Sequence, residues 1–330
     1  MTEKMKAAVY RRYGAPNVVR IEQIPIPALG ETDVLIKIEL TTVSAGDARM
    51  RAMRVPGGFR AIAPLALGVF RPRRPVLGSE FAGEVVRIGR KVTRFKPGDR
   101  VYGGDEGFGC HAEFKTMRES GCIDVVPAHL SPHDVVATIF GGDTAVAFLE
   151  AAKLKPGERV LVVGASGAVG SAAVQIATIM GAEVTGVCSA RNAERVRIWG
   201  ARRVVDYTVS DYRTGPDRYD VIFDATGTAS LSACRKILTP KGRLILAAGG
   251  VRQSLILPAW TALRGGPRVI AGPNMYSPAR FERLAEWVRT GAFKPYVERT
   301  VPFAKIAEAH AHVDTGRKVG NIAVAIPGGE

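Results

Sequence analysis

Two patterns of hydrophobic and polar residues follow one another along this chain. In the first, from Lys6 to Val126, short stretches rich in β-branched residues are separated by Gly and Pro. Three of these stretches are predicted strands: Val34–Leu40, Phe81–Ile88 and Asp99–Tyr102. The segment Lys96-Pro-Gly-Asp99 predicts a turn, because proline sets φ at one position and glycine accepts a positive φ at another. This part of the chain is expected to form a small, irregular β-barrel.

From about His129 the pattern changes to alternating strands and helices. The predicted strands are Arg159–Val163, Glu183–Cys188, Val204–Val205, Asp220–Asp224 and Arg243–Ala248. The predicted helices are Ser171–Met180, Ala193–Trp199 and Leu231–Leu238, followed by a helix at Pro278–Thr290 and a strand at Gly320–Ile326. Alternation of this kind indicates a parallel sheet with helices on both faces.

A glycine-rich turn joins the first of these strands to an alanine-rich helix. Gly164 allows the tight turn, Gly167 lets a diphosphate approach the backbone, and Gly170 lets helix and strand pack closely. The diphosphate then lies against unpaired N–H groups at the positive end of the helix dipole. The expected cofactor-binding residues of this turn are Gly164, Ser166, Gly167, Ala168, Val169 and Gly170. A turn with a purely structural role is the alternative, although the complete strand–turn–helix context favours a dinucleotide.

The end of the second strand indicates which dinucleotide binds. An NAD site usually has Asp or Glu there, about 20 residues further on, to bind the ribose 2′-OH. Here the segment Cys188–Asn192 contains no acid, whereas Ser189 can donate to a 2′-phosphate and Arg191 can pair with it. The segment therefore predicts NADPH, with a solvated loop as the alternative. Tyr207 is a further candidate for contact with the adenosine or its phosphate, and packing is its alternative role.

Length and composition indicate a globular protein of two domains. The chain has 330 residues, of which 46% are hydrophobic and 23% charged, so disorder and fibrous repeats are not expected. The net charge of +15 suits a phosphate-bearing cofactor, and it also permits contact with nucleic acid or an anionic membrane. The basic clusters are not interleaved with aromatic residues, so nucleic-acid binding is not expected. A solvated basic face is the default interpretation, and Arg54–Arg74 is a candidate for surface contact with a membrane.

Targeting and cysteine signals point to the cytoplasm. The longest uncharged apolar stretch, Ala61–Phe70, has ten residues, half of what a membrane crossing needs. Residues 1–10 lack the apolar core of a signal peptide. The four cysteines lie far apart, so we expect reduced thiols.

In its motifs the chain resembles the medium-chain dehydrogenase/reductase superfamily, specifically its zinc-free quinone-oxidoreductase branch. The matching segments are Met5–Tyr10, Asp33–Ile38, Leu77–Val85, Phe95–Val101, the glycine turn and Gly200–Tyr207. The resemblance implies a GroES-like catalytic domain (1–127 and 272–330) split around a Rossmann NADP(H)-binding domain (128–271). It also implies a substrate cleft between the domains and a homodimer or larger assembly.

The zinc enzymes of this superfamily bind metal through Cys, His and a later Cys. The matching positions here are Ser44, Ser79 and the neighbourhood of Phe140–Asp143. Serine hydroxyls are poor Zn²⁺ ligands. His111 and His129 have no partner spacing and are expected to be surface or hydrogen-bonded residues. We therefore expect no metal.

The family's substrate-side signature is an Asn followed three residues later by an Asp. Here these positions hold Ser44 and Asp47, so the Asn is replaced. The resemblance makes both residues catalytic candidates, with Ser44 donating one hydrogen bond to substrate or cofactor. A structural Asp47, paired with Arg51, is the alternative.

The resemblance also supplies candidate contacts to the nicotinamide. Thr144 matches the segment that runs beside this ring, and Lys318 lies near where the family reaches back to the cofactor. Thr226 and Gly249 follow later strands, at the edge where such sheets line the cofactor crevice. Ordinary strand-end turns are the alternative for Thr226 and Gly249.

The expected absence of a metal bears on the reaction. Oxidising a simple alcohol requires removal of a proton whose pKa is ~16, and without a metal the site would need a placed Lys, His or Tyr base. Hydride transfer to a conjugated carbon or a quinone needs only hydrogen-bond donors and a proton from solvent. We therefore interpret the chain as an NADPH-dependent, zinc-independent reductase of quinones or α,β-unsaturated carbonyls. An alcohol dehydrogenase of the same superfamily and a non-catalytic NADPH-binding protein are the alternatives.

Overall fold

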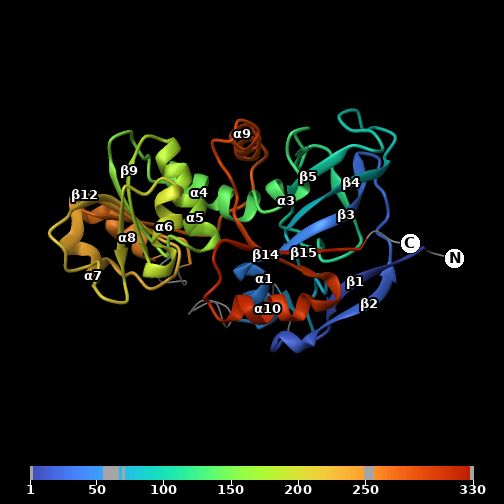
Figure 1. The fold of residues 1–330 in the computed structure, drawn as a ribbon, viewed down its shortest axis with the longest axis horizontal. Coiled ribbons are helices and arrows are strands. Elements are labelled where there is room, and N and C mark those ends of the chain that lie inside the picture. The colour runs from blue at the N-terminus through green and yellow to red at the C-terminus, as the bar shows by residue number, and fades with distance from the viewer. Residues whose placement is uncertain (1–2, 55–66, 69–70, 249–255, 328–330) are drawn as a thin grey trace. The chain divides into compact units, whose positions relative to one another are not determined.

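The chain forms two compact units. The computed structural model describes residues 3–54, 67, 68, 71–248 and 256–327. Of these, 3–54, 67, 68, 71–140 and 275–327 form the first unit, and 141–248 and 256–274 form the second. Figure 1 shows the first unit with blue, cyan and red strands and the second in green to orange. Within the described residues, no helix is long and apolar enough to cross a membrane.

The first unit is built on a seven-stranded sheet in the order β14-β15-β3-β4-β5-β7, with β6 also paired to β3. Its strands are β3 (Asp33–Val43), β4 (Glu80–Ile88), β5 (Arg100–Gly104), β6 (Phe114–Arg118), β7 (Cys122–Val125), β14 (Val297–Pro302) and β15 (Asn321–Ala325). A separate antiparallel pair joins β1 (Lys4–Tyr10) to β2 (Val19–Pro25). The helices of this unit are α1 (Ala45–Arg51), α3 (Pro132–Val135), α9 (Pro278–Arg289) and α10 (Ile306–Asp314).

The turn predicted from Lys96-Pro-Gly-Asp99 is confirmed. The Asp99 N–H donates to the Lys96 carbonyl at 3.2 Å, and Gly98 has a φ of +91°. The three predicted strands of this region correspond to β3, β4 and β5. The stretches rich in β-branched residues therefore located these strands correctly.

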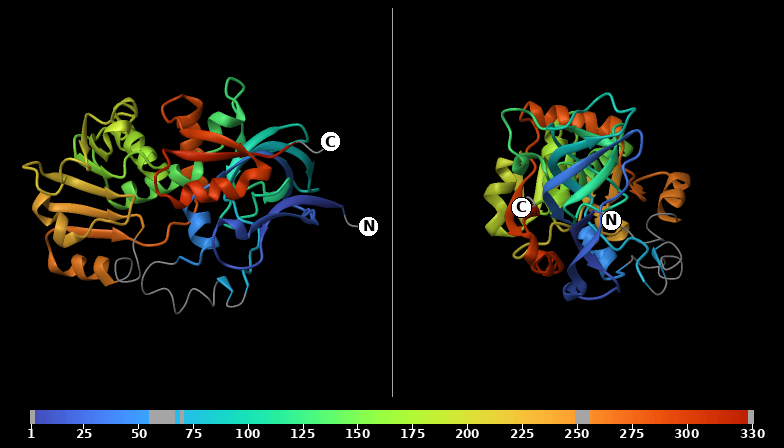
Figure 2. Two further views of the ribbon diagram at one scale, coloured as in Figure 1. Left: turned by 60° about the horizontal axis from the view of Figure 1, so that its bottom comes forward. Right: turned by 90° about the vertical axis from the view of Figure 1, so that its right-hand side faces the viewer.

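The second unit contains a six-stranded, wholly parallel sheet in the order β10-β9-β8-β11-β12-β13. Its strands are β8 (Arg159–Val163), β9 (Glu183–Cys188), β10 (Arg203–Asp206), β11 (Tyr219–Asp224), β12 (Leu238–Leu246) and β13 (Arg268–Ala271). The helices are α4 (Ile139–Ala151), which begins in the first unit, α5 (Ala168–Ile179), α6 (Ala193–Ile198), α7 (Leu231–Cys234) and α8 (Leu257–Arg264). They flank both faces of the sheet (Figure 2). This is the predicted doubly wound Rossmann order, whose direction reverses between β8 and β11.

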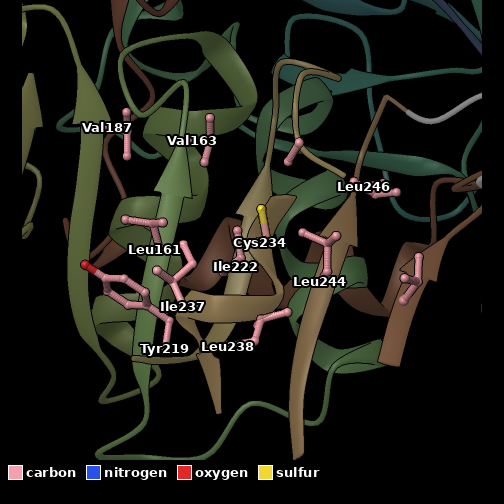
Figure 3. Packing of buried hydrophobic residues seen from close by; sticks show 12 residues of the cluster. Leu161, Val163, Val187, Tyr219, Ile222, Cys234, Ile237, Leu238, Leu244 and Leu246 are labelled. Atoms are coloured by element: carbon pink, nitrogen blue, oxygen red, sulfur yellow. The ribbon is translucent and has the colours of Figure 1, made fainter. Parts of the chain in front are cut away.

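The core of the second unit lies against the central strands. Leu161, Ile222 and Leu244, on β8, β11 and β12, are fully buried and share a cluster with Cys234 and Ile237 (Figure 3). Strands covered on both faces are expected to be apolar, as Val160–Val163 of β8, Val221–Phe223 of β11 and Leu244–Leu246 of β12 are. Their apolar sequence therefore locates the centre of the sheet, where the strand order reverses.

The predicted helix over Leu231–Leu238 is wrong at its end. α7 gives way to a 3₁₀ turn at Arg235–Ile237, and Leu238 already begins β12, where it pairs with Tyr219 on β11. Sheet pairing therefore overrides the local helical pattern. The sequence pattern also did not reveal α4, whose Gly141 lies so close to α5 that a Cβ would be 2.6 Å from the Ala168 carbonyl oxygen.

Candidate functional site

The glycine turn of the second unit follows β8 directly, at the point where the strand order reverses. Gly164 has a φ of +79°, and a Cβ on it would lie 2.4 Å from Thr226 Cγ2. A Cβ on Gly170 would lie 2.0 Å from the Gly164 carbonyl oxygen. Both positions therefore require glycine, one for the turn and one for the close approach of α5 to it.

Gly167 leaves open the approach to the start of α5. A Cβ at this position would meet only the Gly164 carbonyl oxygen, at 3.6 Å. The first N–H groups of a helix have no partner within it, and here they belong to Ala168, Val169 and Gly170. A concave turn of glycines beneath the positive end of a helix dipole fits the diphosphate of a dinucleotide.

The end of β9 is joined to the glycine turn by a residue that the sequence analysis did not single out. Asn192, which is 7% exposed, donates through Nδ2 to Ser166 Oγ at 3.1 Å and to Ser189 Oγ at 3.4 Å. The two predicted cofactor-binding serines therefore lie beside one another. A lone Asn in a loop is usually a turn residue, so its sequence carries little signal of this role.

Arg191 and Tyr207 are exposed at the same end of the sheet. Arg191 lies in the 3₁₀ turn Ala190–Asn192 that follows β9. The Tyr207 N–H donates to the Cys188 carbonyl at 3.3 Å, which places Tyr207 beside the end of β9. Near them, the Asp206 carboxylate accepts hydrogen bonds from Thr208 and from the Ala190 N–H, which lower its pKa.

The carboxyl end of β11 contributes Thr226. Its hydroxyl donates to the buried Asp224 carboxylate at 2.6 Å, and its methyl carbon occupies the space beside Gly164. Thr144 lies on α4, half-buried and one turn after Gly141, which contacts the start of α5. The structure therefore brings Thr226 and the helix of Thr144 to the glycine turn. Gly249 lies outside the described residues.

On the first unit, Ser44 and Asp47 form a capping box at the start of α1. Ser44 Oγ accepts from the Asp47 N–H at 3.1 Å and donates to Asp47 Oδ2 at 2.6 Å, while Asp47 Oδ1 accepts from the Gly78 N–H at 2.9 Å. Both residues are buried. The pairing of Asp47 with Arg51 is wrong, because the buried Arg51 guanidinium pairs with Asp314. The hydroxyl hydrogen of Ser44 is thus already committed to Asp47.

A pair of hydroxyl side chains, Ser79 and Tyr276, lies next to this capping box and is called the hydroxyl pair. Tyr276 Oη donates to Ser79 Oγ at 3.3 Å, and the Tyr276 N–H donates to the Glu106 carboxylate. Ser79 is 5% exposed and follows Gly78, which Asp47 holds. Contacts between residues 197 positions apart leave no local trace in the sequence, so the role of Tyr276 is visible only in the fold.

Glu80 is a fully buried carboxyl group between this pair and α4. It accepts from the Thr42 hydroxyl at 2.6 Å and from the Ile139 and Phe140 N–H groups at 2.8 and 2.7 Å. Burial raises the pKa of Glu80 to about 7, although these hydrogen bonds oppose the shift. Glu80 therefore supplies the acceptor that the first N–H groups of α4 need.

Lys318 is half-buried in the segment between α10 and β15, where its ammonium donates to the Gly320 carbonyl. Burial lowers the pKa of Lys318 to about 8, and the nearby carboxyl groups of Glu298 and Glu80 oppose the shift. Its contact with the cofactor stays a prediction.

The donor set around Ser44 and Ser79 does not fit a zinc ion. Hydroxyls bind Zn²⁺ poorly, and across the described ranges no three His, Cys, Asp or Glu side chains gather as a metal site would require. His111 is buried and hydrogen-bonded through Nε2 to the Thr42 carbonyl at 2.8 Å, and His129 is exposed, as expected. All four cysteines are buried and form no disulfide. We assign no step to a metal.

Two family models match well over half of the chain between them. The alcohol dehydrogenase GroES-like domain matches residues 30–128, and the zinc-binding dehydrogenase model matches residues 199–324.

Curated relatives match along nearly the whole chain. The 2-methylene-furan-3-one reductase of Solanum lycopersicum is 28% identical, over 97% of this chain and 79% of the relative. The NADPH-dependent alkenal/one oxidoreductase of Arabidopsis thaliana is 28% identical, over 98% and 80%. The quinone oxidoreductase of Sus scrofa is 29% identical, over 94% of each chain.

A solved structure shows the same fold. The quinone oxidoreductase of Coxiella burnetii has a TM-score of 0.85 at 22% identity and covers 98% of this chain and 100% of its own. The chain therefore belongs to the medium-chain dehydrogenase/reductase superfamily of oxidoreductases, within its quinone-oxidoreductase-like branch.

Proposed function

We propose that this chain is an NADPH-dependent, zinc-independent reductase that transfers hydride to a quinone or an α,β-unsaturated carbonyl compound. The observation that carries the proposal is the glycine turn at the reversal of strand order, where Gly164 and Gly170 have no room for a side chain and Gly167 leaves the start of α5 accessible. When bound, a reduced nicotinamide supplies the hydride that the acceptor receives. The names of the relatives from tomato, Arabidopsis and pig support the class of acceptor.

The second unit supplies most of the groups that we assign to the cofactor, whereas Lys318 belongs to the first unit. The N–H groups at the start of α5 bind the diphosphate, and Ser189, Arg191 and Tyr207 face the adenosine 2′-phosphate. We assign the remaining cofactor contacts, around the nicotinamide, to Thr144, Thr226, Gly249 and Lys318. NADPH is favoured over NADH because the end of β9 offers hydroxyl and guanidinium donors in place of a carboxylate.

The first unit supplies the donor for the substrate oxygen. During conjugate reduction, negative charge develops on the carbonyl oxygen of an enone or on a quinone oxygen, and hydrogen bonds to that oxygen lower the barrier. The Ser44 hydrogen is committed to Asp47, so Ser44 acts as an acceptor and Asp47 as its support. The Ser79 hydroxyl, which accepts from Tyr276 Oη and keeps its own hydrogen, is the donor that we assign to the oxygen, and Tyr276 supports it.

The remaining assignments follow the resemblance. We propose a homodimer with the domain limits 1–127, 128–271 and 272–330. Its location in the cytoplasm is proposed instead from the cysteine and targeting signals of the sequence. Size-exclusion chromatography with light scattering tests the dimer.

A panel of enones and quinones, incubated with the purified protein and either NADPH or NADH, tests the reaction through loss of nicotinamide absorbance. We expect turnover with NADPH and at least one acceptor in metal-free buffer. NADPH binding without turnover of any acceptor would support a non-catalytic protein. Stoichiometric zinc together with alcohol oxidation would support an alcohol dehydrogenase. Either result would overturn the proposal.

A further inference from the structure

We propose that Asn192 is a positioning residue that selects the phosphorylated dinucleotide by turning the hydroxyl hydrogens of Ser166 and Ser189 toward its 2′-phosphate. The inference rests on the proposed function and deepens it, because it assigns the choice between NADPH and NADH to a side chain that need not touch the phosphate itself.

One amide group holds two serines that come from different connections of the sheet. Ser166 lies in the turn between β8 and α5, whereas Ser189 follows β9. Asn192 Nδ2 lies 3.1 Å from one hydroxyl oxygen and 3.4 Å from the other. Asn192 is itself fixed, because it is nearly buried and its N–H donates to the Ser189 carbonyl at 2.9 Å.

The direction of these hydrogen bonds determines what the serines can do. An amide nitrogen carries two hydrogens and only donates. Each serine oxygen that receives one of them acts as an acceptor, so its own hydrogen remains for another partner. Two hydroxyl hydrogens are therefore available around Asn192, one from the glycine turn and one from the end of β9, and a 2′-phosphate offers only acceptors to them. A ribose 2′-OH accepts less strongly and gains less from this arrangement.

The charged groups nearby are compatible with this assignment. The Asp206 carboxylate accepts from the Thr208 N–H at 2.9 Å and the Thr208 hydroxyl at 2.8 Å, and also from the Ala190 N–H. Three hydrogen bonds thus already use this carboxylate, two from Thr208 in the loop after β10 and one from Ala190 in the turn after β9. Arg191 lies next to Asn192 in sequence and adds a positive charge at the same end of the sheet.

The substitution Asn192→Asp reverses the hydrogen-bond direction with little change of shape. A carboxylate only accepts, so both serines would donate to it and their hydrogens would no longer reach the phosphate. The new negative charge would also repel the phosphate. Asn192→Ala removes the amide donor without introducing an acceptor, so each serine hydroxyl would then rotate freely.

Calorimetric titration of the apoprotein with 2′,5′-ADP and with 5′-AMP tests this inference without turnover. Because charge-assisted hydrogen bonds are lost, we expect Asn192→Asp to weaken 2′,5′-ADP binding by ~10–100-fold and 5′-AMP binding by less than ~3-fold. Asn192→Ala should weaken 2′,5′-ADP binding by ~3–10-fold. Asn17→Asp, which makes the same replacement at an exposed site of the first unit, should change neither.

The outcomes separate this inference from the proposed function. A wild-type protein with equal affinity for NADPH and NADH would contradict the proposed cofactor. A wild-type preference for NADPH that survives in Asn192→Asp would overturn only the role of Asn192. Equal losses of affinity for 2′,5′-ADP and 5′-AMP would make Asn192 a merely structural residue and would also overturn its proposed role. The same holds if both Asn192 variants have a lowered melting temperature but an unchanged ratio of 2′,5′-ADP affinity to 5′-AMP affinity.

Discussion

The glycine turn of the second unit and the hydroxyl pair of the first unit are built in opposite ways. The turn works through backbone, so its requirement is the absence of side chains at Gly164 and Gly170. The hydroxyl pair works through side chains, Ser79 and Tyr276, that come from distant segments. Backbone chemistry leaves a strong local signature in the sequence, whereas an assembled side-chain site uses common residues at unremarkable positions.

Two serines make the same contrast within one residue type. Ser44 donates its hydroxyl hydrogen to Asp47 as part of the helix cap, so that hydrogen is not available to another acceptor. Ser189 receives a hydrogen from Asn192 and keeps its own. The chemistry available at a serine thus depends on its partner, and the residue name alone does not reveal it.

The largest expected effect comes from filling the turn. In Gly170→Ala, the added Cβ would lie 2.0 Å from the Gly164 carbonyl oxygen, so the backbone of the turn must shift. We expect NADPH affinity to fall by ~100-fold or more and stability to fall by ~1–3 kcal/mol. Tryptophan fluorescence titration and a melting curve measure both.

Gly215→Ala is the matched control for this change, because a Cβ there meets nothing within 4 Å and the change lies in the same unit. Gly215→Ala should leave both the NADPH affinity and the stability unaltered. If Gly170→Ala binds NADPH normally, the turn does not cradle the diphosphate, and the contrast between the two regions is lost.

The next effect concerns the hydroxyl pair. Tyr276→Phe removes the hydroxyl that contacts Ser79, so we expect kcat to fall by ~10–100-fold while the Kd for NADPH stays constant. Steady-state kinetics with an enone, together with NADPH titration, measure the two quantities. Tyr13→Phe, which removes a hydroxyl bonded to the Leu67 carbonyl in the same unit, should retain kcat. An unchanged kcat in Tyr276→Phe would remove Tyr276 from the site.

Most of the Rossmann unit was predictable because its sequence is locally consistent. β8 and β9 have the predicted limits, and the continuous apolar run Val160–Val163 of β8 is what a buried parallel strand requires. The glycine positions were predictable for the same reason, because only glycine satisfies a positive φ at Gly164 and the close approach at Gly170. In both cases a local physical requirement restricts the residue choice strongly.

The side-chain partners were not predictable because they depend on tertiary contacts. Glu80 caps α4 from 59 residues away, and Tyr276 meets Ser79 across 197 residues. Asn192 stands close to Ser189 in sequence, yet its contact with Ser166 depends on β9 lying beside β8. The role of Asp47 was open between catalysis and structure, and its three hydrogen bonds favour structure.

A smaller effect tests that role of Asp47. In Asp47→Ala the Ser44 hydroxyl and the Gly78 N–H lose their partner inside the first unit, so we expect the free energy of unfolding to fall by about 2 kcal/mol. Urea denaturation measures this change. The kcat per folded molecule should fall less than ~3-fold. A loss of kcat as large as that of Tyr276→Phe, with stability retained, would make Asp47 catalytic instead.

The smallest effect separates exposed charge from positioned hydrogen bonds at the cofactor site. Arg191 is exposed, so its attraction for a 2′-phosphate is screened by water and salt. We expect Arg191→Ala to weaken NADPH binding by ~3–5-fold at low ionic strength and by less in ~0.5 M salt, as measured by calorimetry. The deficit of Asn192→Asp should persist more strongly in salt, because that side chain is nearly buried. If salt instead abolished both deficits equally, selection of the phosphate would come from general electrostatic attraction, and the buried amide would have no special part in it.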